Sequence, residues 1–167
     1  LDVTQIDMLR MMARWFGRSY RRVYLTMADR MPLAWRALYD WADRHPSKGG
    51  HLIARTAGRS LLRACKRWQP HVVLATHFLG PEILSRAVRT GKLKASLQLV
   101  VTDHDIHRMW YWPQVERYYV ASELVKARLC LRYGVPEDDV LVTGIPVRRE
   151  FLGEHDPVAI RAKYGLD

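Results

Sequence analysis

Cysteine is scarce in this chain, with only Cys65 and Cys130 among 167 residues. The two lie far apart and show no metal-binding or redox spacing, so we expect reduced core thiols, which fits a cytosolic protein. Long apolar runs are also lacking. The longest stretch without Lys, Arg, Asp or Glu runs from Trp68 to Pro81, too short for a membrane span of about 20 apolar residues. No signal peptide is visible.

Acidic residues are scarce in the first part of the chain. Residues 1–68 hold 14 Lys and Arg against 5 Asp and Glu, whereas residues 69–167 hold 13 against 12. A local basic field attracts phosphate, so anionic lipid and nucleic acid are candidate partners, and a solvated Arg-rich surface is the plainer alternative. Because no RNA-binding signature, helix-turn-helix spacing or zinc-finger pattern is present, nucleic acid ranks well below lipid.

Amphipathic, aromatic-rich helices are predicted over residues 8–68, after a short strand over 1–6. The apolar periodicity predicts helices over 8–16, within 20–44 and over 53–68. Arg beside Trp, Met and Phe is typical of a helix that lies in a membrane interface. Regular stripes favour packing on a sheet for 20–44 and 53–68, whereas lipid contact and packing both stay open for 8–22. The membrane-surface candidates are Arg10, Arg14, Trp15, Phe16, Arg18 and Arg22.

Strands and helices alternate in the rest of the chain. Short apolar runs predict strands at 71–75, 97–102, 117–121 and 140–143. Helices are predicted at 81–90, from the Ser122 cap to Tyr133, and at 156–164. This alternation is typical of an α/β fold with a Rossmann-like parallel sheet and flanking helices. The carboxyl ends of such strands carry the chemistry.

Polar residues follow two of these strands. His77 comes after the first, where a histidine can bind a substrate hydroxyl or act as a base, although a loop histidine bonded to backbone is the plainer explanation. Asp103 opens the run DHDIH, whose Asp-X-Asp pattern is one way to hold a divalent ion. We expect no metal, because no second acidic cluster lies nearby in sequence. Asp103 is better suited to fixing a sugar or glycerol hydroxyl.

Bulky and rigid residues lie close to these polar positions. Three consecutive aromatics at 110–112 predict at least one exposed platform, with Trp110 beside a sugar ring or an acyl chain. After the last strand, Gly144 permits a close turn and Pro146 stiffens the exit. Arg148 is expected either to meet a phosphate or to be a solvated charge at a hinge. We expect the strand tips that bear Asp103 and Gly144 to lie side by side and to line a groove.

The run VTDHDIHRMWYW and the later GIPVRREF resemble the amino-terminal domain of the monogalactosyldiacylglycerol synthases and bacterial diacylglycerol glucosyltransferases, of glycosyltransferase family 28. The shared positions include Thr102–Asp103, His107, Trp110 and the GIPVR element at 144–148. The similarity covers most of the chain. Each motif alone is modest, but their order and spacing are fairly specific.

The resemblance implies half of a GT-B fold, in which two Rossmann-like domains face a deep cleft. Residues 1–155 would form a partial acceptor-side domain, with a basic helical part over 8–68 and a sheet core over 71–152, and residues 156–167 would begin the interdomain linker. We expect the chain to be incomplete at both ends. By the resemblance, the family's opening Gly-rich loop with its catalytic histidine would precede this chain, and the carboxy-terminal domain that binds the UDP-sugar would follow it.

The expected function is transfer of a hexose from a UDP-sugar to diacylglycerol. The resemblance and the residues together assign catalytic roles to Asp103 and His77 and acceptor contacts to His107, Trp110, Gly144, Pro146 and Arg148. No cofactor is expected besides the UDP-sugar donor of the missing domain. We expect peripheral attachment to an anionic membrane surface on the cytoplasmic face, and no activity from this chain alone. Alternatives are a lipid-II-forming transferase, a sugar-nucleotide epimerase, or a non-catalytic lipid- or nucleic-acid-binding module.

Overall fold

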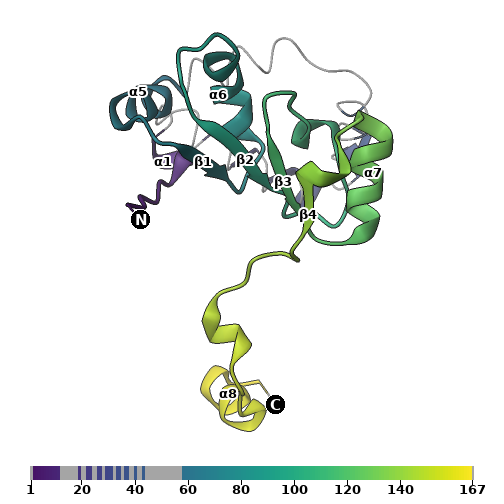
Figure 1. Ribbon diagram of the computed structural model, residues 1–167. Helices are drawn as coiled ribbons and strands as arrows, with labels where there is room; N and C mark the ends of the chain where they lie inside the picture. Colours follow the sequence, from purple (N-terminus) through teal and green to yellow (C-terminus); the bar gives the residue numbers. More distant parts are fainter. Residues whose placement is uncertain are drawn as a thin grey trace.

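Four parallel strands form one sheet in the computed structural model, and the strand order β1-β2-β3-β4 follows the chain (Figure 1). The structure describes residues 2–11 and 58–166, and between them 19, 22–23, 26–27, 29–31, 33–34, 36–37, 40 and 43. The strands are β1 Val72–Ala75, β2 Ser96–Val100, β3 Arg117–Val120 and β4 Val140–Val142. Each lies within two residues of its predicted bounds, so the predicted parallel α/β sheet is confirmed.

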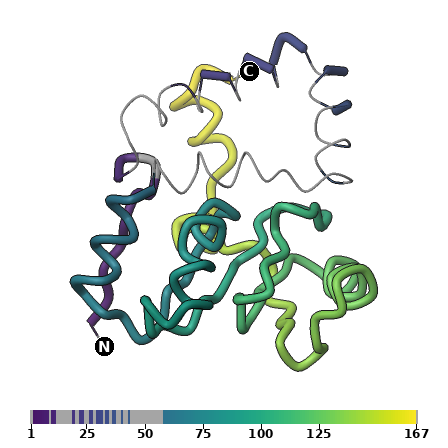
Figure 2. Tube along the Cα trace, turned by 90° about the horizontal axis from the view of Figure 1, so that it is seen from above, coloured from purple at the N-terminus to yellow at the C-terminus, as the bar shows by residue number. Residues whose placement is uncertain are grey.

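The strand predicted over residues 1–6 is wrong, since residues 2–7 are neither strand nor helix. Residues 2–5 are exposed, and Ile6 is the first apolar side chain of this segment to pack against the core. Four exposed positions in a row leave no face to bury, so this segment lacks the apolar surface that supports a strand. It runs instead alongside α5 Arg59–Trp68, as Figure 2 shows.

The remaining helices are close to their predicted positions. They are α1 Met8–Met11, α6 Leu79–Arg89, α7 Glu123–Tyr133 and α8 Pro157–Tyr164, with short 3-10 helices η1 Arg108–Trp110, η2 Glu137–Asp139 and η3 Arg149–Leu152. The described residues of 19–43 are helical apart from Met31. The predicted caps of α7 are confirmed, because the Ser122 side chain accepts from the amide of Val125 and Gly134 adopts a φ of 68°.

Helix α5 begins at Arg59 and not at Ile53, because Gly58 lies in a turn directly before it. At this point the chain approaches α6 closely, and a Cβ on Gly58 would meet Ile83 at 2.6 Å. The predicted residues 53–57 lie outside the described part of the chain. The apolar line of α5 packs inward as predicted, with Leu61 and Cys65 buried.

The core lies between the sheet and helices α6 and α7. Because strand order follows chain order, right-handed crossovers place both helices on the same face. That face carries the fully buried strand residues, namely Leu97, Leu99, Tyr118, Val120 and Val140. On the opposite face Val72, Leu74 and Leu141 are exposed. The face toward α6 and α7 is therefore buried, whereas the opposite face is exposed at its edge strands and covered at Val100, which is 5% exposed.

The carboxy-terminal residues leave the sheet altogether. After β4 the chain runs through η3 to α8, which lies well away from the other elements in Figure 1. Every described residue from 146 onward is exposed. Asp156 caps α8 by accepting from the amides of Val158 and Ala159, so this helix is locally specified without packing on the sheet.

Candidate functional site

Two neighbouring strand ends bring His77 and Asp103 together. β1 and β2 pair in parallel, with Ala75 opposite Leu99, so the residues that follow them lie at the same edge of the sheet. His77 follows β1 by two residues, and Asp103 follows β2 by three. The nearby charge of Asp103 acts to raise the pKa of His77. This proximity arises from strand order, which no local pattern in the sequence specifies.

The Asp103 carboxylate is held by an indole. Nε1 of Trp110 donates a hydrogen bond to Oδ2 of Asp103 at 2.8 Å. Trp110 is only 2% exposed, and it packs edge-on against Phe78 with the ring centroids 5.7 Å apart. A buried indole has few alternative rotamers, so this bond fixes the direction of the carboxylate.

His77 is a neutral imidazole oriented by the backbone. Its Nδ1 accepts the amide hydrogen of Leu79 at 3.2 Å, so in the neutral ring the proton resides on Nε2. Burial lowers the pKa of His77 below its usual value, and the charge of Asp103 opposes this only in part. Because its Nδ1 lone pair is engaged, the neutral imidazole is better suited to donating a hydrogen bond through Nε2 than to removing a proton.

Trp110 packs inward, so an exposed platform at this ring is wrong, while its predicted contact with the acceptor stays a prediction. Trp110 is buried, and Tyr111 and Trp112 are half-buried against the core. Tyr111 stacks on Tyr133 of α7 with ring centroids 4.8 Å apart, and the Trp112 indole donates to the carbonyl of Met109. All three rings fit because η1 turns the chain between β2 and β3, which we name the β2–β3 loop (residues 101–116).

His107 is also inside this loop. It is 3% exposed, its Nδ1 accepts the amide hydrogen of Met109 at 3.2 Å, and its Nε2 lies 3.7 Å from Oδ1 of Asp43. The side chain is thus committed to the interior of the loop rather than to its surface. The predicted acceptor contact of His107 stays a prediction.

Gly144, Pro146 and Arg148 follow β4 at the same carboxyl edge. The prediction that Gly144 lies side by side with Asp103 is wrong, because β3 stands between β2 and β4. Gly144 does allow the predicted turn, with a φ of 75°, and its amide donates to the carbonyl of Val120 at 3.2 Å. Pro146 and Arg148 are exposed. Their acceptor contacts stay predictions.

The predicted membrane-surface residues are only partly described. Arg10 and Arg22 are exposed, and Arg10 pairs with Asp7 at 3.1 Å. Arg14, Trp15, Phe16 and Arg18 lie outside the described residues.

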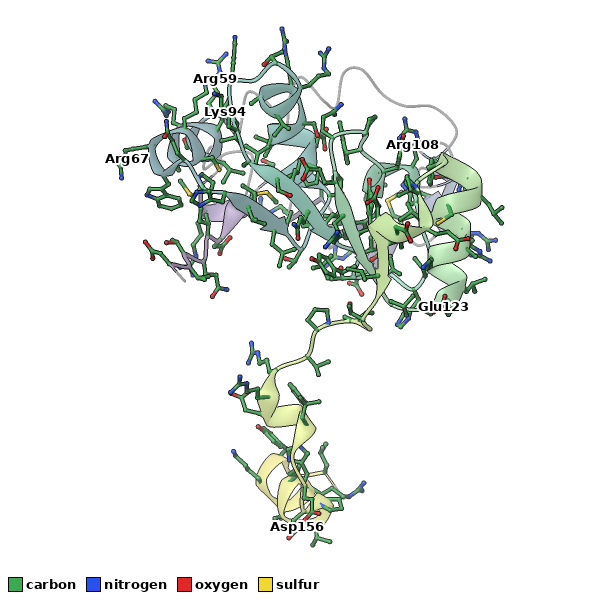
Figure 3. All side chains as sticks on the ribbon, in the orientation of Figure 1. Arg59, Arg67, Lys94, Arg108, Glu123 and Asp156 are labelled. Carbon is green, nitrogen blue, oxygen red and sulfur yellow. The ribbon has the colours of Figure 1, made fainter. Side chains whose placement is uncertain are left out.

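A second basic surface, which was only partly anticipated, covers α5, α6 and the turn before β2. It carries eight exposed cations, which we name the cationic face: Arg59, Arg63, Lys66, Arg67, Arg86, Arg89, Lys92 and Lys94. Glu82 is the sole acidic residue between positions 58 and 94. Figure 3 shows Arg59, Arg67 and Lys94 around α5, at the opposite end of the molecule from Glu123 on α7. A count of charged residues over positions 58–94 would have revealed the cationic face from the sequence.

Two open hollows lie elsewhere on the described surface. One, of about 370 Å³, is lined by Asp105, Ile106, Arg128, Leu131 and Arg132. The other, of about 520 Å³, is lined by Trp68 and residues of the amino-terminal segment. Neither of these two hollows includes His77 or Asp103. Among the described residues, no three His, Cys, Asp or Glu side chains are grouped to hold a metal ion.

The sequence as a whole matches a known family over most of its length. The profile of the family described as monogalactosyldiacylglycerol (MGDG) synthase matches residues 1–147. The chain belongs to the MGDG synthase family. The resemblance drawn from the VTDHDIHRMW and GIPVR runs is thereby confirmed, and the four-stranded parallel sheet is consistent with the amino-terminal half of a GT-B glycosyltransferase.

Three relatives of this chain share one name. A processive diacylglycerol beta-glucosyltransferase of Bacillus licheniformis is 30% identical over 135 residues, which cover 79% of this chain and 34% of that protein. Proteins of the same name from Bacillus pumilus and Staphylococcus haemolyticus are 40% identical over 78 residues and 31% identical over 107 residues. These matches cover 47% and 64% of this chain, and 20% and 27% of the respective relatives. The chain thus spans about a third or less of the length of these relatives.

Proposed function

We propose that this chain is the acceptor-side part of a glycosyltransferase that moves a hexose from a UDP-sugar to the free hydroxyl of diacylglycerol. The names of the relatives support diacylglycerol as the acceptor class. The carboxyl edge of the parallel sheet supports the location of the site. The donor would bind a carboxy-terminal part, for which the greater length of the relatives leaves room.

The observation that carries this proposal is the pair of oriented polar groups at the ends of β1 and β2. Oδ2 of Asp103 accepts the hydrogen bond from the Trp110 indole, and among the described residues no hydrogen bond to Oδ1 is present. In the proposed complex Oδ1 accepts the hydrogen of the acceptor hydroxyl. Nε2–H of His77 donates to an oxygen of the same headgroup. The two side chains would thereby direct the hydroxyl oxygen toward the sugar's anomeric carbon.

Proton transfer is proposed to follow the same geometry. As the hydroxyl oxygen bonds to the anomeric carbon, the bond from that carbon to the diphosphate oxygen breaks and UDP departs. The hydroxyl proton must also leave, and a carboxylate within hydrogen-bond reach lowers the barrier by accepting it as a general base. The neutral His77 does not compete for that proton, because its Nδ1 lone pair is engaged by the amide of Leu79. Asp103 is therefore proposed as the catalytic residue and His77 as a residue that binds the acceptor headgroup.

Attachment to an anionic membrane on the cytoplasmic face is part of the proposal. Diacylglycerol is a membrane lipid, so its transferase must work at a bilayer surface. No helix among the described residues is long and apolar enough to cross a membrane. The cationic face supports electrostatic attachment, since its cations greatly outnumber its acids.

The test uses an enzyme that carries this chain together with its donor-binding part. Asp103→Asn keeps the shape and the bond from Trp110 but removes the base, so turnover of diacylglycerol with a UDP-hexose should fall by about 100-fold or more. Asp138→Asn, a change of an exposed carboxylate in η2, is the matched control and should retain full turnover. Equal turnover of the Asp103 variant and the parent enzyme would refute the proposed role of Asp103.

This chain alone provides a second readout of the same assay. We expect no glycolipid from the isolated 167 residues with UDP-hexose and diacylglycerol, because the donor side is proposed to lie in the additional length of the relatives. Product formation by this chain alone would contradict the division into acceptor and donor parts.

A further inference from the structure

Asp43 joins three parts of the chain that are distant in sequence. Its Oδ1 accepts the backbone N–H of Arg108 at 2.7 Å and lies 3.7 Å from Nε2 of His107. Its Oδ2 pairs with the guanidinium of Arg132 on α7. The Arg108 and Arg132 contacts span 65 and 89 positions of the chain. One side chain thus connects the amino-terminal helical part, the β2–β3 loop and α7.

The surroundings of Asp43 favour a charged and well-directed carboxylate. Partial burial acts to raise the pKa of Asp43, but the hydrogen bonds from Arg132 and from the Arg108 amide, with the nearby charges, outweigh it and hold the pKa below its usual value. The side chain is only 19% exposed. Charge-assisted hydrogen bonds in a partly buried place are stronger and less screened than exposed ones.

The loop that Asp43 holds is the loop that carries the candidate site. Arg108 begins η1, and Trp110 ends it. The Trp110 indole in turn donates to Asp103, so a continuous chain of contacts runs from the Asp43 carboxylate through η1 to the Asp103 carboxylate. Figure 3 shows Arg108 beside the end of α7 that lies away from Glu123. The contacts of Asp43 with Arg108 and Arg132 therefore hold the loop of the site against α7.

We propose that Asp43 is a positioning residue for the candidate site, because its carboxylate fixes η1 against α7 and η1 holds the indole that orients Asp103. The catalytic consequence rests on the proposed function, whereas the positioning can be measured without any turnover. Asp43 acts through Arg108 and Trp110 and does not itself touch the proposed acceptor.

A neighbouring ion pair offers a matched comparison. Asp105 of the same loop pairs with Arg128, one turn before Arg132 on α7, at 2.5 Å. The two carboxylates differ in exposure, at 64% for Asp105 and 19% for Asp43, whereas Arg128 and Arg132 are similarly exposed, at 48% and 45%. Water and salt screen an exposed pair, so its contribution to the position of the loop should be small. Asp105→Ala removes this ion pair and the acceptor of the Ile106 amide, but it leaves the contacts of Asp43 in place.

The first measurement is amide hydrogen exchange on this chain and its variants. Asp43→Ala should raise exchange of residues 103–112 by about tenfold or more, while strands β1 and β2 keep their protection. The indole N–H resonance of Trp110 should shift, because its bond to Asp103 loses its fixed geometry. Asp105→Ala should stay within about twofold of the parent chain over the same residues, except at Ile106, whose amide donates to Oδ1 of Asp105. Asp43→Asn, which keeps the shape and loses the charge, serves where Asp43→Ala does not fold, and should raise the same local exchange.

The second measurement uses the enzyme with its donor part. Asp43→Ala should lower kcat by about tenfold, because a displaced Asp103 is poorly aligned, while the KM for the UDP-hexose stays unchanged. Asp43→Glu should recover part of the lost kcat. Protection of residues 103–112 that is unaltered in Asp43→Ala and Asp43→Asn, or lost equally throughout the sheet, would overturn the proposal. If even the parent enzyme transfers no hexose, the proposed function fails, and the exchange data still decide the role of Asp43.

Discussion

At the scale of single residues, the candidate site is made of side chains whose hydrogen bonds are directed inward. Trp110 orients Asp103, the Leu79 amide orients His77, and Asp43 holds the start of η1. Each polar group is fixed by a neighbour that is buried or backbone-bound. Such arrangements are typical of sites in which the reacting groups must be aligned before the substrate arrives.

The half-buried His77 should make the fold sensitive to acid. Because burial holds the pKa of His77 below its unfolded value, the neutral ring stabilises the fold fully above the unfolded pKa, and this stability is lost as pH falls through the folded pKa. His77→Asn keeps an acceptor for the Leu79 amide but does not titrate. Between about pH 7.5 and about pH 5, the free energy of unfolding in urea should therefore fall more in the parent chain than in His77→Asn.

The control for this prediction is His155→Asn, a change at an exposed histidine outside the site. It should lose stability with pH as the parent chain does. The same acid dependence in the parent and in His77→Asn would show that the burial of His77 does not penalise its charged form.

At the scale of elements, helix α6 lies unusually close to β1. Gly80 in the first turn of α6 leaves no room for a side chain, since a Cβ there would meet the Cβ of Ala75 at 2.8 Å. This close approach brings the residues between β1 and α6, including His77, down onto the sheet edge. The position of His77 thus depends on the packing of α6 against β1.

Gly80→Ala should therefore destabilise the fold. Alanine is favoured over glycine inside a helix by about 1 kcal/mol, but the Ala75 Cβ is attached directly to the backbone of β1 and cannot move aside as a long side chain would. Overpacking of this kind costs about 1–3 kcal/mol, so the net free energy of unfolding should decrease. Urea titration followed by circular dichroism measures the change.

Gly153→Ala is the matched control, because Gly153 has a φ of −84° and a Cβ there would meet nothing within 4 Å. It should change the free energy of unfolding by less than about 0.5 kcal/mol. A Gly80→Ala variant as stable as Gly153→Ala would mean that α6 can shift away from β1 at little cost.

At the scale of the whole molecule, charge is distributed unevenly over the surface. The cationic face has eight cations over α5, α6 and the turn before β2. The three acidic residues of η2 lie together after the carboxy-terminal end of α7. The surface is therefore more positive on the α5 side than on the α7 side. A negatively charged surface would attract it by the α5 side and leave the α7 side toward water.

Binding to anionic vesicles should depend on where the charge is removed, not only on how much. Reversal of two cations of this face, in Arg67→Glu/Lys94→Glu, should weaken binding to vesicles of phosphatidylglycerol and phosphatidylcholine by about tenfold or more in a flotation assay. Arg161→Glu/Lys163→Glu in the projecting α8 changes the net charge equally and should weaken binding less. Higher salt should weaken binding of the parent chain.

Equal loss of binding by the two double variants would contradict an oriented attachment and would indicate attraction by net charge alone. Tighter binding to RNA than to vesicles would instead favour the nucleic-acid alternative that composition left open.

Much of the fold and part of the site followed from local patterns. Apolar runs predicted β1 to β4, Ser122 and Gly134 predicted the ends of α7, and the order of motifs predicted the family. These features depend on residues that are close in sequence, so a single chain is enough to specify them. His77 and Asp103 were identified for the same reason, since polar residues directly after buried strands are a local signal.

Only the tertiary structure decided which of these residues meet. Strand order makes His77 the neighbour of Asp103 and puts β3 between Asp103 and Gly144. Packing turned the aromatics of 110–112 inward, and the contacts of Asp43 joined positions as far as 89 residues apart. Sequence by itself determined the elements, because their signals lie within a few turns of chain. The site needed the fold, because hydrogen bonds and burial depend on distances in space between residues that local patterns do not relate.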